Sequence, residues 1–590
     1  MTQDQAMLFG LLFFVFVFLI WGRWRYDLVA FIALLVAVLI GVVPKDQAFS
    51  GFGHPATIII ALVLIVSRGL SNSGAIELVA RHVVKASRKL AAHITIMSGL
   101  AAGLSALMNN VAALALLMPV DMQAAKKAGR SPSLSLMPLS FASILGGMIT
   151  MIGTPPNIVV AEFRGDALGE PYRMFDFAPV GLACAAIGVA YVALIGWRLL
   201  PQDRQSSDAG KELFDLADYI AEVRVPEGSG VVGKRVRDLD VAAAKVDVEV
   251  IGLIRRGRRL PGLARIAEIK ADDILVVEAS PDSLEEALGA LELEYVGKGE
   301  GQLGDEDLVL QEVVVPESSK LAGRSAISVR MLYRYRVALV GISRQGRRFR
   351  DKVRKLALEP GDVLLLLGPE ERLSDVKGRL GLLPLADRGH SVIKRDKVWL
   401  AVGTFAAAIA VASFGWVYLP IALGCVAAIY LLSNIVPIRD VYTSIEWPVI
   451  VLLGSMIPIG GALQSTGGTA LIAGGIVDIS VGFSPVVVLT LLVVVTMTLS
   501  DVMNNTATAV IAAPIAVEIA SRLGVNPDPF LMGVAVAASC AFLTPIGHKN
   551  NTLIMGPGGY RFGDYWRMGL PLEILIVIVS VPAIITFWPM

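Results

Sequence analysis

The chain has 590 residues, of which 55% are hydrophobic and only 17% are charged, and its mean hydropathy is +0.66. A soluble protein carries about 25% charged residues, so this composition excludes a protein that is soluble throughout and predicts a membrane protein with several spans. The apolar residues fill 6–200 and 398–590, whereas 201–396 has the composition of a soluble insert. The formal net charge of +1 identifies no partner, and we expect none among nucleic acids.

The first part of the chain contains three apolar stretches, at about 6–21, 28–43 and 56–70. The segment 21–26 combines aromatic residues with arginines, which is typical of a cytoplasmic membrane interface, so the N-terminus is predicted to lie outside. Residues 74–90 mix charged and apolar side chains and predict an amphipathic helix on the cytoplasmic membrane surface.

Residues 91–125 are apolar but are interrupted in their middle by Asn109-Asn110. Basic residues flank both ends, so both ends are expected on the cytoplasmic side. We therefore predict a re-entrant hairpin with the asparagines at its tip, where the backbone must be buried in protein or line a cavity. The next stretch enters the membrane at 134–152, and the prolines of 153–157 break it before a last span at about 178–200.

The soluble insert follows a linker at 201–214 and contains a duplication, because the segment 225–229 recurs ninety residues later as 315–319. The copies predict two small α+β domains, at 215–298 and 305–385. Expected strands are 274–277 and 363–367, and expected helices are 281–291 and 370–380. A glycine pattern at 228–233 fits a phosphate-binding turn only weakly, and we interpret it as structural.

Both copies resemble the C-terminal regulatory domain of Trk-type potassium uptake proteins, the TrkA-C type. The resemblance implies that the domains pair and that they bind a small regulatory ligand, such as an ion or cyclic di-AMP.

The second apolar half repeats the plan of the first. Spans are expected at about 398–415, 418–436 and 445–464, a hairpin at 485–521 around Asn504-Asn505, and a half-helix at 529–543 that breaks at 544–551. A final span follows at about 570–588. Each half then crosses the membrane an odd number of times, so the halves should be inverted repeats, as in secondary transporters. The chain is predicted to lie in the cell (inner) membrane with 201–396 in the cytoplasm and both termini outside.

Hairpin tips and broken spans bring free backbone groups and helix N-termini into the membrane interior, where they attract anions. Asparagine amides can donate to an anion or accept a cation through their carbonyl oxygens. Carbonyl groups at Gly153 and Thr544-Pro545 suit a hard cation such as sodium. The pattern predicts one site, built from both halves, for a divalent anion and its balancing cations.

These tip motifs and breaks resemble those of the divalent anion/sodium symporter family, of the branch with two TrkA-C type domains between the membrane halves. The resemblance implies a substrate site formed by Asn110, Val111, Asn505 and Thr506. It also implies two sodium sites, formed by Ser105, Asn109, Asn110 and Gly153, and by Ser500, Asn505, Thr544 and Pro545.

The chain departs from the family pattern at both tips and at the second break. Asn109 and Asn504 replace the serines of the tips, Val111 replaces a threonine, and the second break inserts His548 and Lys549. These departures point to the branch with regulatory inserts, and the resemblance to that branch implies sulfate-type substrates. Because the second tip keeps its threonine, we expect the second half to hold the anion more tightly than the first.

Other roles stay open for several polar residues. The asparagine pairs could join packed helices. Asp501 could carry a proton, pair with a lysine or face the aqueous vestibule, and Asn157 and Asn504 could belong to the site. His548 and Lys549 could neutralise a bound anion or form a solvated pair at the cytoplasmic mouth.

The sequence thus predicts a polytopic α-helical membrane protein that is not an enzyme. The expected function is cation-coupled symport of a small divalent anion, with sodium as the coupling ion, no other cofactor and a homodimer in the bilayer. The family implies an elevator mechanism. The alternatives are a di- or tricarboxylate symporter and, in another class, a ligand-gated ion channel controlled by the cytoplasmic domains.

Overall fold

The computed structural model describes all residues except 22–23, 75–89, 202–219, 240–247, 256–257, 260–266, 279–287, 290, 299–308, 318, 336, 345–346, 350–352, 369, 386–396 and 480–482. The amphipathic helix expected at 74–90, the linker expected at 201–214 and most of the helix expected at 281–291 therefore lie outside the described residues.

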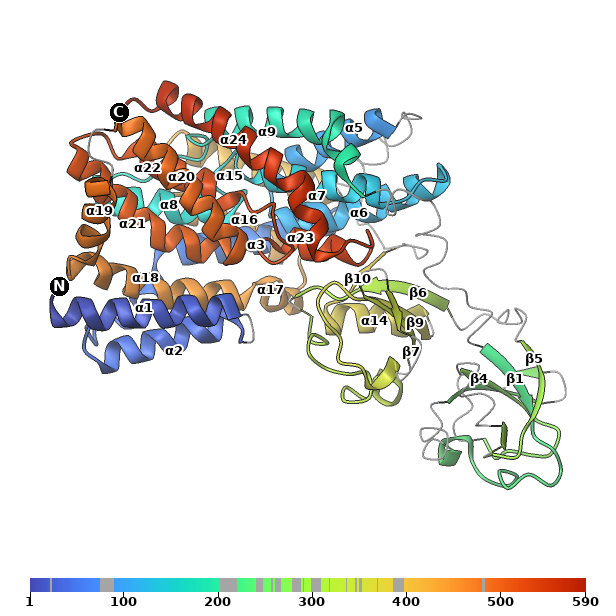
Figure 1. Ribbon diagram of the computed structural model, residues 1–590. Coiled ribbons are helices and arrows are strands. Elements are labelled where there is room, and N and C mark those ends of the chain that lie inside the picture. Colours follow the sequence, from blue (N-terminus) through green and yellow to red (C-terminus); the bar gives the residue numbers. More distant parts are fainter. Residues whose placement is uncertain are drawn as a thin grey trace.

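The described residues form a large bundle of helices and two small sheets (Figure 1). The sheets lie at one end of the bundle, and both chain termini lie at the other end. The less apolar middle of the sequence therefore lies far from both chain ends.

The first apolar half forms helices that end where polar residues, glycines or prolines interrupt the apolar pattern. The break between α5 and α6 falls at the first asparagine pair, and the break between α7 and α8 falls just before the two prolines. The helices of this half are α1 (Gln3–Trp21), α2 (Tyr26–Leu39), α3 (Pro55–Asn72), α5 (Leu90–Ser105), α6 (Asn110–Lys127), α7 (Ser133–Gly147), α8 (Pro155–Leu168) and α9 (Ala178–Leu194).

The second half also contains two interruptions of this kind. α20 and α21 are separated at the second asparagine pair, and α22 and α23 are separated at the second break. Its helices are α15 (Val398–Ser413), α16 (Leu419–Leu432), α17 (Ile438–Ser444), α18 (Trp447–Ser465), α19 (Gly468–Ile479), α20 (Pro485–Val502), α21 (Asn505–Leu523), α22 (Asp528–Ser539), α23 (Lys549–Met555) and α24 (Tyr565–Phe587).

Length and composition are consistent with a multi-pass membrane protein. Among the described residues, five helices are long and apolar enough to cross a membrane, namely Pro55–Ser73, Trp447–Ser465, Pro485–Val502, Asn505–Leu523 and Phe562–Phe587. Large apolar side chains such as Leu39, Trp399 and Leu432 are more than four-fifths exposed on the outside of the bundle. Such exposure would be costly in water but suits contact with lipid.

The two broken helices lie at the centre of the bundle. Every residue of α7 and of α22 is buried. One apolar cluster extends through both halves, and Phe141 of α7 packs on Phe542, just after α22, with ring centroids 4.9 Å apart. The points at which these helices stop are therefore enclosed by protein from both halves.

The middle of the chain forms two antiparallel five-stranded sheets, with strand orders β3-β2-β4-β1-β5 and β10-β6-β9-β7-β8. The strands expected at 274–277 and 363–367 fall within β4 and β9, and the helix expected at 370–380 is α14. The elements are β1 (Ile220–Arg224), β2 (Glu249–Arg255), β3 (Arg258–Arg259), β4 (Ile274–Glu278), β5 (Glu294–Lys298), β6 (Val309–Val314), β7 (Ala338–Arg344), β8 (Arg347–Phe349), β9 (Val363–Gly368), α14 (Glu370–Leu380) and β10 (Leu383–Pro384).

The two sheets share their polar details. In the first, Arg255 of β2 binds both carboxylate oxygens of Asp273, at 2.8 and 2.7 Å, and in the second Arg344 binds Asp362 in the same way at 2.8 Å. In each case a bidentate pair closes the turn before the central strand. The hydrogen bond that Arg344 donates to Asp362 raises the pKa of the Arg344 guanidinium, so this arginine holds its proton more tightly.

Candidate functional site

The first tip is built by the asparagine pair between α5 and α6. Asn109 Oδ1 accepts a hydrogen bond of 2.8 Å from the backbone N–H of Val111, so its side chain caps the start of α6. The Val111 side chain packs against the main apolar cluster. Asn110 is the residue of this tip whose side chain faces other polar groups.

Three side-chain oxygens converge beside this tip. Ser105 Oγ donates to Asn110 Oδ1 at 2.6 Å, and Ser143 Oγ lies 3.4 Å from Ser105 Oγ. Ser143 also donates to the backbone carbonyl of Asn110 at 2.8 Å. All three residues are buried, so they form a polar cluster inside the bundle. Ser143 was not among the residues that the sequence singled out.

Glycines allow the first break to approach the tip. A Cβ atom on Gly147, the last residue of α7, would lie 2.2 Å from Asn110 Oδ1, and one on Gly153 would lie 2.4 Å from the carbonyl oxygen of Gly147. Thr150 Oγ1 donates to the carbonyl of Ala106 at 2.5 Å, which ties the break to the hairpin. Asn157 Nδ2 donates to the carbonyl of Thr150 at 2.9 Å and holds the loop closed.

The second tip has the same cap. Asn504 Oδ1 accepts from the backbone N–H of Thr506 at 3.0 Å, and Asn505 Oδ1 accepts from the same N–H at 2.8 Å. The Thr506 side chain is buried, and its hydroxyl lies 3.3 Å from Asn505 Oδ1. Ser500 Oγ donates to the carbonyl of Ala538 at 2.6 Å, which joins this hairpin to the end of α22.

The second break repeats the bonds of the first. Thr544 Oγ1 donates to the carbonyl of Asp501 at 2.5 Å, and Asn551 Nδ2 donates to the carbonyl of Thr544 at 3.1 Å. The carbonyl of Pro545 accepts from Thr552 Oγ1 at 2.6 Å. In each half a threonine of the break, Thr150 or Thr544, therefore donates to the backbone carbonyl of the residue after Ser105 or Ser500. An asparagine of the same break, Asn157 or Asn551, donates to the carbonyl of that threonine.

These hydrogen bonds match Thr544 with Thr150 and Asn551 with Asn157. The sodium ligands that the resemblance implies, Gly153 in the first break and Thr544 and Pro545 in the second, therefore do not occupy equivalent positions. The signal for the correct match is present in the sequence, because 150–157 and 544–551 share the pattern Thr-x-Ile-Gly-x-x-x-Asn. Prolines obscure it because only the first copy has the Pro-Pro pair.

The first tip and the second break meet directly. Asn110 Nδ2 lies 3.2 Å from His548 Nε2, and Asn550 Nδ2 donates to the backbone carbonyl of Asn110 at 3.3 Å. Ser140 Oγ of α7 donates to Asn551 Oδ1 at 2.9 Å. His548 is only 7% exposed, and its Nδ1 accepts the backbone N–H of Asn550, so it lies inside the junction and caps α23. No hydrogen bond joins residues 105–111 directly to 500–506.

Charged residues flank this junction. Lys549 Nζ pairs with Oε2 of Glu446, which precedes α18, and each side chain is 24% exposed. The charge of Lys549 is thus balanced by a carboxylate at the start of α18. Asp501 is 2% exposed and accepts from the backbone N–H of Leu543 at 2.9 Å, while Glu573 of α24 accepts from the neighbouring N–H of Phe542 at 3.3 Å.

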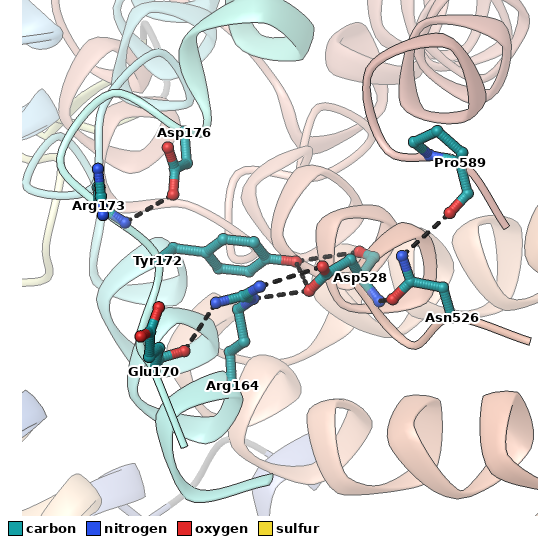
Figure 2. Close-up of polar contacts among 8 residues, drawn as sticks. All are labelled: Arg164, Glu170, Tyr172, Arg173, Asp176, Asn526, Asp528 and Pro589. Atoms are coloured by element: carbon teal, nitrogen blue, oxygen red, sulfur yellow. Dashed lines mark hydrogen bonds and ion pairs between the residues drawn. The ribbon is translucent and has the colours of Figure 1, made fainter. Parts of the chain in front are cut away.

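A second junction between the halves lies away from the tips. Arg164 of α8 binds both carboxylate oxygens of Asp528, at the start of α22, at 2.7 and 3.1 Å. Tyr172 donates from its hydroxyl to the same residue, and the guanidinium of Arg164 lies 4.8 Å from the centre of the Tyr172 ring. Figure 2 shows these side chains converging on Asp528. The two broken helix pairs are therefore held together by an ion pair as well as by apolar packing.

The donors at the junction favour some ligands over others. In the part of the chain that the structure describes, no group of three His, Cys, Asp or Glu residues could hold a metal ion. The converging groups are hydroxyl, amide and backbone carbonyl oxygens, which suit hard cations rather than transition metals.

Comparison with known proteins gives the family. The citrate transporter family model matches residues 16–520 and 481–590. The transporter YfbS of Escherichia coli K12 is 31% identical over the whole of both chains, and the transporter sll0640 of Synechocystis is 30% identical over 94% of this chain and 92% of its own. Sodium/sulfate cotransporter 2 of Chlamydomonas reinhardtii is 21% identical over 93% of this chain and 85% of its own. The chain belongs to the citrate transporter family.

Proposed function

We propose that this chain is a secondary active transporter that imports a small divalent oxyanion of the sulfate type together with sodium. The family supports transport, and the similarity to a sodium/sulfate cotransporter supports both the cation and the anion. The observation that carries the proposal is the junction at which Asn110 of the first half meets His548 and Asn550 of the second. A ligand held there contacts both halves, so relative movement of the two parts can expose it to either side.

The tips suit an anion. α6 and α21 begin at the asparagine pairs, and the positive ends of their helix dipoles attract negative charge. Asn110, Asn505 and Thr506 would bind the anion through amide and hydroxyl donors, while Val111 supplies no donor from its side chain. Binding would therefore be asymmetric, with more side-chain contacts from the second half.

The oxygens around each tip suit sodium. Ser105 Oγ and Asn110 Oδ1 lie 2.6 Å apart, with the break at Gly153 close by, and this set would hold one ion. Ser500, Asn505, Thr544 and Pro545 would hold the second through hydroxyl, amide and carbonyl oxygens. The bound cations would lower the cost of placing a divalent anion inside the bundle. Asn109 and Asn504 cap helices in this scheme and support the sites indirectly.

The expected movement is of the elevator type. The moving unit would contain the two hairpins and the broken helices, and α2, α3, α16 and α18 would form the scaffold of a homodimer. In this arrangement the halves are inverted repeats in the cell membrane, and the sheet domains lie in the cytoplasm. The Lys549–Glu446 ion pair joins the second break to α18, so it would have to open during transport.

Uptake into proteoliposomes tests this function. Radiolabelled sulfate, succinate and citrate would be compared under imposed sodium or proton gradients. We expect sulfate uptake to require an inward sodium gradient and to fall in Asn505→Ala, with Thr95→Val on the exposed face of α5 as a control variant. If no anion is driven by either gradient, the chain is not a symporter, and flux faster than a carrier allows would favour the channel.

One observation favours a second candidate. The family model that matches the chain is described as a citrate transporter, so a di- or tricarboxylate could be the substrate. The same assay separates the two, because a carboxylate symporter would accumulate citrate or succinate and would show no sulfate competition.

A further inference from the structure

The ring of His548 presents an N–H donor to the interior of the junction. Its Nδ1 accepts the backbone N–H of Asn550 at 3.1 Å, and a ring nitrogen that accepts a hydrogen bond carries no proton. An imidazole with a bare Nδ1 holds its single proton on Nε2. In the part of the chain that the structure describes, the contact of this buried Nε2 is with Asn110. The cap that His548 places on α23 therefore also aims a donor at the first tip.

The side chain of Asn110 faces this donor with a donor of its own. Ser105 Oγ donates to Asn110 Oδ1 at 2.6 Å, which leaves Asn110 Nδ2 turned toward His548 Nε2 at 3.2 Å. Two N–H groups cannot hydrogen-bond to each other, and a buried donor without an acceptor is costly. One oxygen atom of an anion beside both nitrogens would accept from both. In this arrangement the pair of donors is therefore incomplete without such an acceptor.

The amide of Asn110 has a second arrangement in the same place. Exchange of its oxygen and nitrogen needs a half-turn of the terminal torsion, which is broad and nearly two-fold in asparagine. Oδ1 then accepts from His548 Nε2 and Nδ2 donates to Ser105 Oγ, so each group is paired without a ligand. The backbone of Asn110 stays fixed, because its carbonyl accepts from Ser143 Oγ at 2.8 Å and from Asn550 Nδ2 at 3.3 Å. The movable part of this contact is thus the amide alone.

We propose that His548 binds the transported anion as a neutral donor, and that sodium controls this contact by setting the orientation of the Asn110 amide. The inference rests on the proposed function, in which Ser105, Asn110 and Gly153 hold one sodium ion. That ion can bind the Asn110 side chain only through Oδ1, because an amide nitrogen donates and does not accept. Sodium therefore selects the arrangement in which two donors converge, and its absence favours the arrangement that needs no anion.

This coupling has a defined ligand class and a defined reciprocal effect. The converging groups are neutral N–H donors, so they recognise an anion through its oxygen atoms, and hydrogen bonds to a charged oxygen are stronger than those between neutral groups. Sulfate-type oxyanions and carboxylates both offer such an oxygen. Because coupling between two binding sites is reciprocal, the anion must raise the affinity for sodium by the same factor. The chain departs from the family pattern at His548, so this donor is a specific feature of the chain.

Two substitutions separate the donor from the cap. Asparagine is a favoured N-cap and keeps the bond to the backbone, but it is too short to reach Asn110, whereas glutamine carries an amide N–H to about the place of Nε2 and is not a favoured cap. Binding of radiolabelled sulfate and citrate to the purified full-length chain is measured at low and at high sodium. We expect His548→Asn to weaken binding at high sodium by about tenfold or more and to remove most of its sodium dependence. His548→Gln should recover part of both, and Thr95→Val on the exposed face of α5 should change neither.

Thermal unfolding of the same variants should give the opposite order. His548→Asn keeps the cap and should unfold near the midpoint of the unchanged chain, whereas His548→Gln should unfold at a lower temperature. If anion affinity instead follows the unfolding midpoint, so that His548→Gln binds more weakly than His548→Asn, the ring acts only as a cap and the inference is overturned. Unchanged binding in His548→Asn, with sodium-driven uptake intact, would overturn this inference alone. Absence of sodium-driven uptake in the unchanged chain would overturn the proposed function and this inference together.

Discussion

Replacing Gly147 by alanine tests whether Asn110 holds the ligand. An added Cβ would lie 2.2 Å from Asn110 Oδ1, and an ordinary contact needs at least 3.4 Å, so the amide must retreat by about 1.2 Å. Ser105 Oγ now lies 2.6 Å from that oxygen, and the same retreat would stretch this hydrogen bond beyond 3.5 Å. The contact with His548 Nε2, at 3.2 Å, would be lost with it.

The magnitude follows from these two contacts. A hydrogen bond contributes about 0.5–1.5 kcal/mol net, so losing two weakens the binding free energy of the site by about 1–3 kcal/mol. At about 1.4 kcal/mol for each factor of ten, the concentration of anion or sodium that gives half-maximal uptake should rise by roughly 5- to 150-fold. The fold should survive, because the displaced group is one side chain rather than a backbone segment.

The assay is anion uptake into proteoliposomes over a range of sodium and anion concentrations. Gly103→Ala is the matched control, because Gly103 lies in α5 of the same hairpin and its added Cβ would meet nothing within 4 Å. Gly103→Ala should transport normally. If Gly147→Ala also shows unchanged affinities for both ions, Asn110 takes no part in binding, and the site must be placed elsewhere.

Other perturbations address the second half, the junction and the sheet domain. Thr544→Val removes a hydroxyl of the proposed second sodium site together with its hydrogen bond to Asp501. The sodium concentration that gives half-maximal uptake should therefore rise in this variant, whereas it should stay the same in Thr95→Val. An unchanged sodium dependence in Thr544→Val would remove this residue from the site. Asp528→Asn leaves the partly buried Arg164 without a counter-charge, which costs about 3–5 kcal/mol in a buried pair. The variant should therefore unfold at a lower temperature in detergent. An unchanged unfolding midpoint would show that the ion pair contributes nothing to stability. The hydrogen bond that Arg344 donates to Asp362 raises the pKa of Arg344 above its ordinary value, so the stabilisation from this arginine is complete at every pH below that ordinary pKa and is lost only above it. Asp362→Asn should therefore lower the midpoint equally at about pH 7 and about pH 10, and a difference between the two would contradict this account.

Much of the architecture follows from local properties of the sequence. Apolar composition predicts the membrane class, and the interruptions at Asn109-Asn110 and Asn504-Asn505 fall where α5 and α20 give way to α6 and α21. Asparagine placed before a helix caps it wherever the chain lies, so the tips could be recognised from the residues alone. The strands within β4 and β9 and the helix α14 were likewise predictable from apolar runs and periodicity.

Contacts between distant segments could not be read in this way. The meeting of Asn110 with His548 joins residues 438 positions apart, and the pairing of Lys549 with Glu446 gives this lysine a partner that the sequence did not indicate. The contribution of Ser143, Asn550 and Glu573 likewise depends on which helices pack together. Sequence by itself determined where the asparagine pairs and the breaks interrupt the apolar helices, because such interruptions are local consequences of side-chain polarity and backbone propensity. Only the tertiary structure decided which interruptions face one another, because that depends on packing between halves that no local pattern records.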